Sequence, residues 1–100
     1  MSFSRIRDFL ISLFYRWKPS RSVILYTRNG CTCCEKARDQ LERFRVKYRL
    51  EITTVDVDTD PLLVQRYGLE VPVVLIDGKV RFRGLVNPTL LERLLKSKSS

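Results

Sequence analysis

The fold is decided by the stretch Val23-Ile24-Leu25-Tyr26-Thr27-Arg28-Asn29-Gly30-Cys31-Thr32-Cys33-Cys34. Its first five residues are apolar, β-branched or aromatic, and they predict a buried strand at about residues 22–27. The next three predict a turn, and the cysteines open a helix of about residues 32–48. Two thiols three positions apart at the start of a helix are the layout of a dithiol redox site.

The two outer cysteines of this stretch have different expected roles. A cysteine at a helix N-terminus lies where unpaired backbone N–H groups and the helix dipole favour the thiolate, which is the form that attacks a disulfide. Cys31 is therefore the candidate nucleophile. Cys34 lies just under one helical turn later, so both sulfurs fall on one side of the first turn. Cys34 is the candidate resolving thiol, which displaces a mixed disulfide formed by Cys31.

Composition limits the class of protein. One hundred residues with 44% hydrophobic content suit a single compact domain. The net charge of +8 makes nucleic acid, anionic membranes and acidic proteins candidate binding partners. After the first twenty residues the cations alternate with acids, and no aromatic or glycine-rich constellation supports nucleic-acid binding. Three cysteines within four residues cannot staple distant segments, so we expect a protein of the reducing cytoplasm rather than a secreted one. We also expect a monomer.

The N-terminal segment has a pattern of its own. Residues 3–17 carry apolar side chains at helical spacing, which predicts an amphipathic helix. At ~1.5 Å per residue the helix would reach about 22 Å, short of the ~30 Å hydrocarbon core of a bilayer. Three interpretations stay open: a helix packed on the domain, a peripheral membrane anchor, or an organellar presequence. We therefore divide the chain into this helix and its linker (1–21) and a second part (22–100).

Beyond the first strand, strand and helix patterns alternate. In the first helix one apolar stripe faces the core, comprising Cys34, Ala37, Leu41, Phe44 and Tyr48. Further strands are expected at 51–57, 71–76 and 79–85, a short helix from Pro61 to about Tyr67, and a last helix after Asn87-Pro88 with Leu90, Leu91, Leu94 and Leu95 on one face. Crossovers require parallel pairing of the first strands, and the Asp77-Gly78 turn requires antiparallel pairing of the last two. The result is a mixed four-stranded sheet between helices.

Over about residues 22–96 the chain resembles the glutaredoxin-like branch of the thioredoxin superfamily. The resemblance rests on residues 26–34, on Val55-Asp56-Val57-Asp58 and on residues 67–78. It implies an α/β, thioredoxin-like fold of order βαβαββα, here preceded by the extra N-terminal helix. It also implies a glutaredoxin-like thiol:disulfide oxidoreductase without an organic cofactor, acting on protein or small-molecule disulfides.

The resemblance also assigns three substrate-binding residues. Pro72 would follow a cis peptide bond that faces the cysteines and turns the backbone of Val71 toward an extended thiol substrate. Arg28 stands where similar proteins often carry a lysine, and its cation would further favour a Cys31 thiolate. The alternative for Arg28 is a merely solvated turn residue.

Three departures from the family pattern bear on the substrate. The cysteines enclose Thr32-Cys33 rather than Pro-Tyr or Gly-Pro, which leaves the redox potential open. Glu70 replaces a frequent threonine, and residues 83–87 lack the Gly-Gly-x-x-Asp stretch associated with glutathione. The family resemblance suggests glutathione as a co-substrate. These departures count against it, because Glu70 would repel an anionic tripeptide.

The middle cysteine leaves alternatives open. Cys33 is interpreted as a small half-buried hydrophobe or as a spare redox thiol, although a bridge to either neighbouring cysteine would be strained or badly aligned. Three clustered thiols without any histidine also allow a metal-binding module, holding Cu(I) or sharing an iron–sulfur or zinc site between chains. A third alternative is a non-catalytic scaffold delivered to a membrane by residues 3–17.

Overall fold

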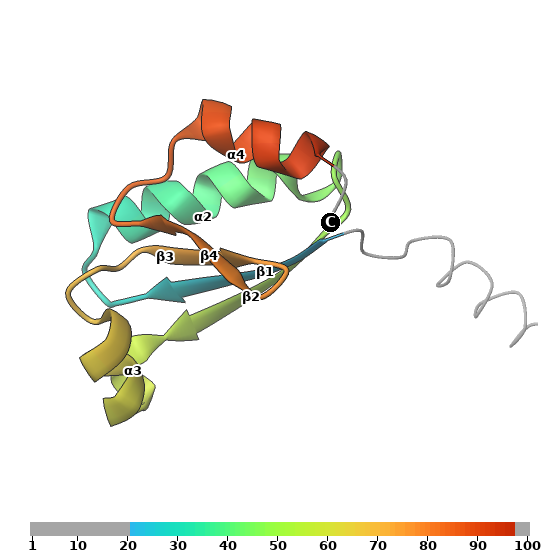
Figure 1. Ribbon diagram of the computed structural model, residues 1–100. Helices are drawn as coiled ribbons and strands as arrows, with labels where there is room; N and C mark the ends of the chain where they lie inside the picture. Colours follow the sequence, from blue (N-terminus) through green and yellow to red (C-terminus); the bar gives the residue numbers. More distant parts are fainter. Residues whose placement is uncertain (1–20, 98–100) are drawn as a thin grey trace, which may run out of the picture.

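The computed structural model describes residues 21–97, which form a four-stranded sheet between helices (Figure 1). The strands lie in the order β2-β1-β3-β4, with β1 and β3 in the middle. The elements in chain order are β1 (Arg21–Thr27), α2 (Thr32–Arg45), β2 (Leu50–Asp56), the 3₁₀ helix η1 (Val57–Thr59), α3 (Pro61–Tyr67), β3 (Val73–Ile76), β4 (Lys79–Arg83) and α4 (Pro88–Lys96). The predicted order is confirmed, with η1 added.

The strand pairing follows from the connections. β1 pairs with β2 in parallel through the α2 crossover, and with β3 antiparallel. β3 and β4 form the predicted antiparallel hairpin. Its turn residues Asp77 and Gly78 have φ of 52° and 82°. Positive φ at both positions gives the backbone twist that a two-residue hairpin needs, and Asp-Gly is a favoured pair there.

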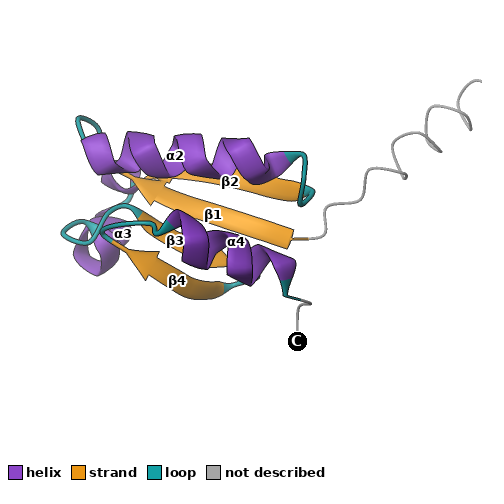
Figure 2. Cartoon of the chain, turned by 90° about the horizontal axis from the view of Figure 1, so that it is seen from above, coloured by secondary structure: helices purple, strands orange, loops and turns teal. Residues whose placement is uncertain are grey.

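Helices α2 and α4 cover one face of the sheet and α3 covers the other (Figures 1 and 2). The larger core lies under α2 and α4; its buried members are Val23, Leu25, Ala37, Leu41, Leu50, Val74, Ile76, Phe82, Leu91 and Leu95. A smaller cluster of Val57, Tyr67 and Val73 lies with α3, where Tyr67 stacks on Tyr26 at 4.6 Å between ring centroids. Alternate residues of β1 serve the two faces, as strand geometry dictates.

Several element boundaries differ from the prediction. Helix α2 ends at Arg45 rather than near residue 48, because the chain reverses into β2 through a turn in which Arg49 has φ 53°. β2 runs one residue earlier than predicted, since the Asp56 side chain accepts the Asp58 N–H at 2.9 Å and caps η1.

The last two strands are shorter than predicted. β3 begins at Val73 rather than Val71. β4 ends at Arg83 because Gly84, at φ 83°, turns the chain away from the strand path. In α4 the apolar face comprises Leu91, Leu94 and Leu95, while the predicted member Leu90 is 46% exposed.

An ion pair ties the start of β1 to the hairpin turn. The Arg21 guanidinium, which is nearly buried, donates to Asp77 Oδ2 at 2.8 Å and to the Leu94 carbonyl at 3.4 Å. The Ser22 N–H donates to Asp77 Oδ1 at 3.1 Å. These hydrogen bonds, first the one from Arg21, lower the pKa of Asp77 below its ordinary value.

The predicted helix at residues 3–17 lies outside the described residues, together with its three interpretations. Among residues 21–97, no helix is both long enough and apolar enough to cross a membrane.

Candidate redox site

Cys31 is the N-cap of α2, as its position in the sequence predicted. It follows the turn that ends β1, where Gly30 has φ 75°. The backbone of Cys31 is extended, and its Sγ accepts the N–H of Cys34 at 3.2 Å. Its carbonyl accepts the first helical hydrogen bond, from Glu35 N–H at 3.2 Å. Cys31 is half-exposed, and its sulfur lies at the N-terminal end of the helix.

Cys34 lies on the buried side of the same helical turn. Only 2% of its surface is exposed, because it begins the apolar stripe of α2. Burial, and secondarily a hydrogen bond with the Cys31 sulfur, raise the pKa of the Cys34 thiol to about 11. Cys34 is therefore protonated at neutral pH. Cys33 is half-exposed, and all three cysteines are free thiols.

A small pocket opens beside the two outer cysteines, with a volume of about 260 Å³. Besides both thiols, it is lined by Thr27, Arg28, Asn29, Gly30, Glu35, Arg38, Thr54 and Asp56. Glu35, Arg38 and Asp56 were not among the predicted site residues, although Asp56 belongs to the Val55-Asp56-Val57-Asp58 motif that carries the family resemblance. The available signals were weak. Glu35 and Arg38 lie about one helical turn after Cys31 and Cys34 on α2, and Asp56 ends β2, the strand that pairs with β1. Two carboxylates thus share a pocket with the buried thiol.

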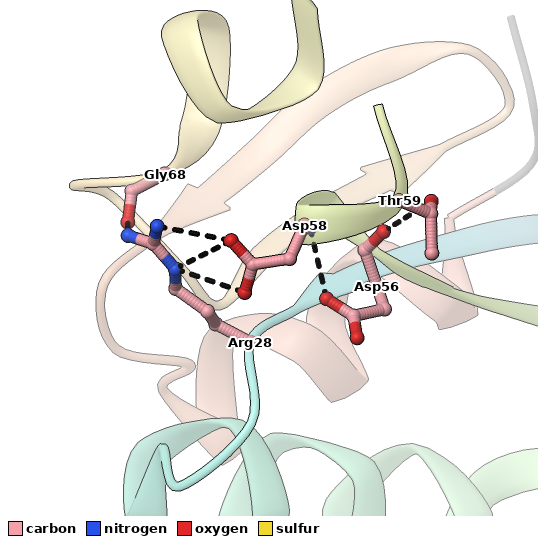
Figure 3. A network of polar contacts seen from close by, with 5 residues as sticks. All are labelled: Arg28, Asp56, Asp58, Thr59 and Gly68. Carbon is pink, nitrogen blue, oxygen red and sulfur yellow. Dashed lines mark hydrogen bonds and ion pairs between the residues drawn. The ribbon is translucent and has the colours of Figure 1, made fainter. Parts of the chain in front are cut away.

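Arg28 is held by polar contacts with two other segments of the chain (Figure 3). Its Nε and Nη2 donate to the Asp58 carboxylate at 3.0–3.2 Å, and its Nη1 donates to the Gly68 carbonyl at 3.1 Å. The hydrogen bond and the charge of Asp58 raise the pKa of Arg28 above its ordinary value. The Arg28 charge is therefore compensated by Asp58, and its contacts tie the turn before Cys31 to η1 and to the end of α3.

The Val71–Pro72 peptide bond is cis, as predicted. Pro72 is buried and Val71 is half-buried. Because Val73 pairs with Tyr26, this bond lies at the end of the sheet from which the Cys31 turn leaves. That the bond faces the cysteines and that Val71 pairs with a substrate both stay predictions.

Glu70 is paired with Arg83 through their side chains. The carboxylate is therefore compensated by a cation, which weakens the repulsion of an anionic tripeptide expected from the sequence.

Within residues 21–97, no group of three or more Cys, His, Asp and Glu side chains is arranged to hold a metal ion.

The family model "Glutaredoxin-like domain (DUF836)" matches residues 22–96. The chain belongs to this family. Curated relatives of this glutaredoxin-like domain include uncharacterized proteins from Mycobacterium tuberculosis and Mycobacterium bovis, each 36% identical over 62 residues. The matched region covers 57% of this chain and 64% of each relative, which is less than two thirds of their length.

Solved structures show the fold of this glutaredoxin-like domain. A protein from Nitrosomonas europaea matches with a TM-score of 0.67 at 22% identity, over 79% of this chain and 95% of its own. A mutant thioredoxin from Halobacterium salinarum gives 0.62 at 21%, covering 82% and 77%. Oxidized mitochondrial thioredoxin 3 from Saccharomyces cerevisiae gives 0.58 at 21%, covering 87% and 88%. The predicted α/β thioredoxin-like fold is confirmed.

Proposed function

We propose that this glutaredoxin-like domain is a thiol:disulfide oxidoreductase in which Cys31 attacks and Cys34 resolves. One observation carries the proposal: two thiols on a single helical turn have opposite settings. Cys31 is half-exposed at the helix start, with its sulfur 3.2 Å from the Cys34 nitrogen, whereas the Cys34 thiol is buried and protonated. We assign this activity to the second part of the chain, residues 22–100.

The reaction has two displacement steps. The Cys31 thiolate attacks one sulfur of a substrate disulfide, whose S–S bond breaks and releases one substrate thiolate. Cys34 then loses its proton and attacks the Cys31 sulfur, which releases the second substrate thiol. The substrate disulfide gains two electrons, and the protein ends as the Cys31–Cys34 disulfide. A thiol reductant, small or protein-borne, returns it to the dithiol.

The buried thiol must lose a proton for the second step. The first strand offers no acid there, since Leu25 and Val23 are buried hydrophobes. Glu35 and Asp56 line the pocket beside Cys34, so carboxylate acceptors are available at that point. Because Cys34 keeps its proton at neutral pH until then, Cys31 reacts first.

Serine variants test the assignment. Cys31→Ser should abolish reduction of a disulfide substrate. Cys34→Ser should accumulate a mixed disulfide on Cys31, which mass spectrometry identifies after tryptic digestion. Cys33→Ser is the matched control and should keep turnover. A mixed disulfide trapped on Cys33, or a fast-alkylating thiol that persists in Cys31→Ser, would contradict the proposal. Supplying glutathione as the reductant tests it as the co-substrate.

A further inference from the structure

One end of the sheet carries an excess of cationic side chains. It is the end opposite the cysteines, where α2 and α4 finish and β1 begins (Figure 1). Arg21, at the start of β1, pairs with Leu50 of β2 and donates to the Leu94 carbonyl in the last turn of α4. The β3–β4 turn lies there too, because Asp77 pairs with Arg21. We call this region the far end; its exposed cations are Arg43, Arg45, Lys47, Arg49, Lys79, Arg93 and Lys96.

Acidic side chains compensate only part of this charge. The carboxylates near these cations belong to Glu42, Glu51 and Glu92. The last of them is shared between two cations, Lys96 at 3.2 Å and Lys47 at 3.9 Å. Among the described residues, neither Arg43 nor Arg49 forms an ion pair. The far end therefore keeps a net positive charge.

The cysteine end has no such excess, because its cations are matched by as many carboxylates. The cations are Arg28, Lys36, Arg38, Arg66 and Arg83, and the acids are Glu35, Asp56, Asp58, Asp60 and Glu70. Cations in the last turn of a helix offset the helix dipole, but Lys47, Arg49 and Lys79 lie outside the helices. Helix stabilisation therefore does not account for the whole excess at the far end.

The chain enters the domain at this same end, since residues 1–20 are joined to Arg21. The sequence of that segment has apolar residues at helical spacing over residues 3–17. It also adds the cations Arg5, Arg7, Arg16 and Lys18. A cationic face of the domain and a cationic, amphipathic sequence thus meet at one point of the chain.

Apolar side chains at the far end distinguish between two anionic partners, lipid and nucleic acid. Val46 lies between two cations of the chain and is 66% exposed. Phe44 and Tyr48 pack against the core, whereas proteins that bind single-stranded nucleic acid present aromatic side chains on which the bases stack. Exposed apolar and cationic groups together are typical of a surface that binds anionic lipid.

We infer that the far end rests on an anionic lipid surface, which leaves the cysteine end turned toward the solvent. Each cation near such a surface adds to the attraction, and salt weakens it. Stable attachment takes a second, apolar contribution, which the sequence of residues 3–17 offers. The contact fixes the orientation of the domain and keeps Cys31 open to a substrate from solution. It does not depend on the thiol chemistry proposed above.

Vesicle binding by the full chain tests the far end. Vesicles of equal parts phosphatidylcholine and phosphatidylserine are compared with vesicles of phosphatidylcholine alone, which should bind much less. Arg43→Gln/Arg49→Gln should weaken binding to the anionic vesicles about tenfold at low salt, with little effect at high salt. The matched control Lys36→Gln/Arg66→Gln removes the same charge at the cysteine end and should change the Kd by less than about twofold. No binding by wild type, or equal effects of the two variants, would overturn the inference.

A second readout uses wild type alone and stands even where a variant unfolds. In bicelles of the same two lipids with a nitroxide label on the head groups, the amide NMR signals of residues 46–49 should lose intensity. Those of residues 31–34 should keep it. Intensity loss at residues 31–34, or at neither segment, would overturn the orientation. Tighter binding to a DNA duplex than to the anionic vesicles, lost in Arg43→Gln/Arg49→Gln, would assign the far end to nucleic acid instead.

Discussion

Removal of the Cys34 thiol should change how the stability of the reduced domain depends on alkaline pH. Cys34 is 2% exposed, and its pKa is raised from the ordinary 9.0 to about 11, first by burial and then by the hydrogen bond with Cys31. In the unfolded chain the same thiol is in water and titrates near its ordinary value. The two states therefore hold the Cys34 proton with different strength.

The sign follows from which state ionises first. As the pH rises above 9, the unfolded chain loses the Cys34 proton while the folded domain keeps it, so ionisation favours unfolding and stability falls until about pH 11. A difference from 9.0 to about 11 corresponds to about 3 kcal/mol when complete. About 2 kcal/mol of it is lost by pH 10.5, and almost none by about pH 8.

Urea unfolding of the reduced protein, followed by far-UV circular dichroism, measures this effect. Cys34→Ala lacks the buried thiol. Between pH 8 and pH 10.5 the free energy of unfolding of wild type should therefore fall by about 2 kcal/mol more than that of Cys34→Ala. Lysines and tyrosines titrate in both proteins and cancel in the comparison. Cys33→Ala is the control, because the half-exposed Cys33 should leave the pH dependence unchanged. Parallel curves for wild type and Cys34→Ala would refute the reasoning.

Three further predictions concern other parts of the chain. Asp77→Asn keeps a residue that suits the turn but leaves the nearly buried Arg21 without its carboxylate, so the free energy of unfolding at pH 7 should fall by about 2 kcal/mol in urea. Because the pKa of Asp77 is lowered, the wild-type advantage should be present above its ordinary value of 3.8 and shrink as the pH falls below it; a gap that stays constant would contradict the ion pair. Arg28→Lys keeps the charge but loses the forked contact with Asp58, so hydrogen exchange of the turn amides should quicken, and unchanged exchange would reject the tie. The full chain should co-sediment with anionic liposomes in a salt-sensitive way, and removal of residues 1–20 should abolish this binding. If the full chain does not bind liposomes and the truncation lowers the melting temperature, the segment belongs to the fold instead.

Local patterns predicted the parts of the site that depend on neighbours in sequence. The N-cap position of Cys31 follows from the turn and the helix that flank it, and the hairpin follows from Asp77-Gly78. The burial of Cys34 follows from the helical stripe that it begins. In each case the residues that decide the outcome lie within a few positions of one another, where strand and helix periodicity is informative.

Contacts between distant segments were not predictable in the same way. Arg28 meets Asp58 and Gly68, which are 30 and 40 positions away. The choice among the partners open to a turn arginine depends on how η1 and α3 are placed on the sheet. The pattern of residues could show that Asp58 follows a strand, but not that its carboxylate reaches Arg28. The same holds for Glu70, whose charge suggested repulsion of a substrate until its pairing with Arg83 was visible.

The contrast between the two outer thiols has a geometric origin. The apolar stripe of α2 begins at Cys34 and continues through Ala37 and Leu41, so the helix rotation that buries those residues also buries this sulfur. Cys31 precedes the first helical residue, and its backbone is extended, so it stays at the rim of the core although it lies three positions away. Under the proposed mechanism, the exposed sulfur meets the substrate while the buried one keeps its proton. Both side chains carry the same chemical group, so only their different surroundings at the start of α2 can set the order of the two displacement steps.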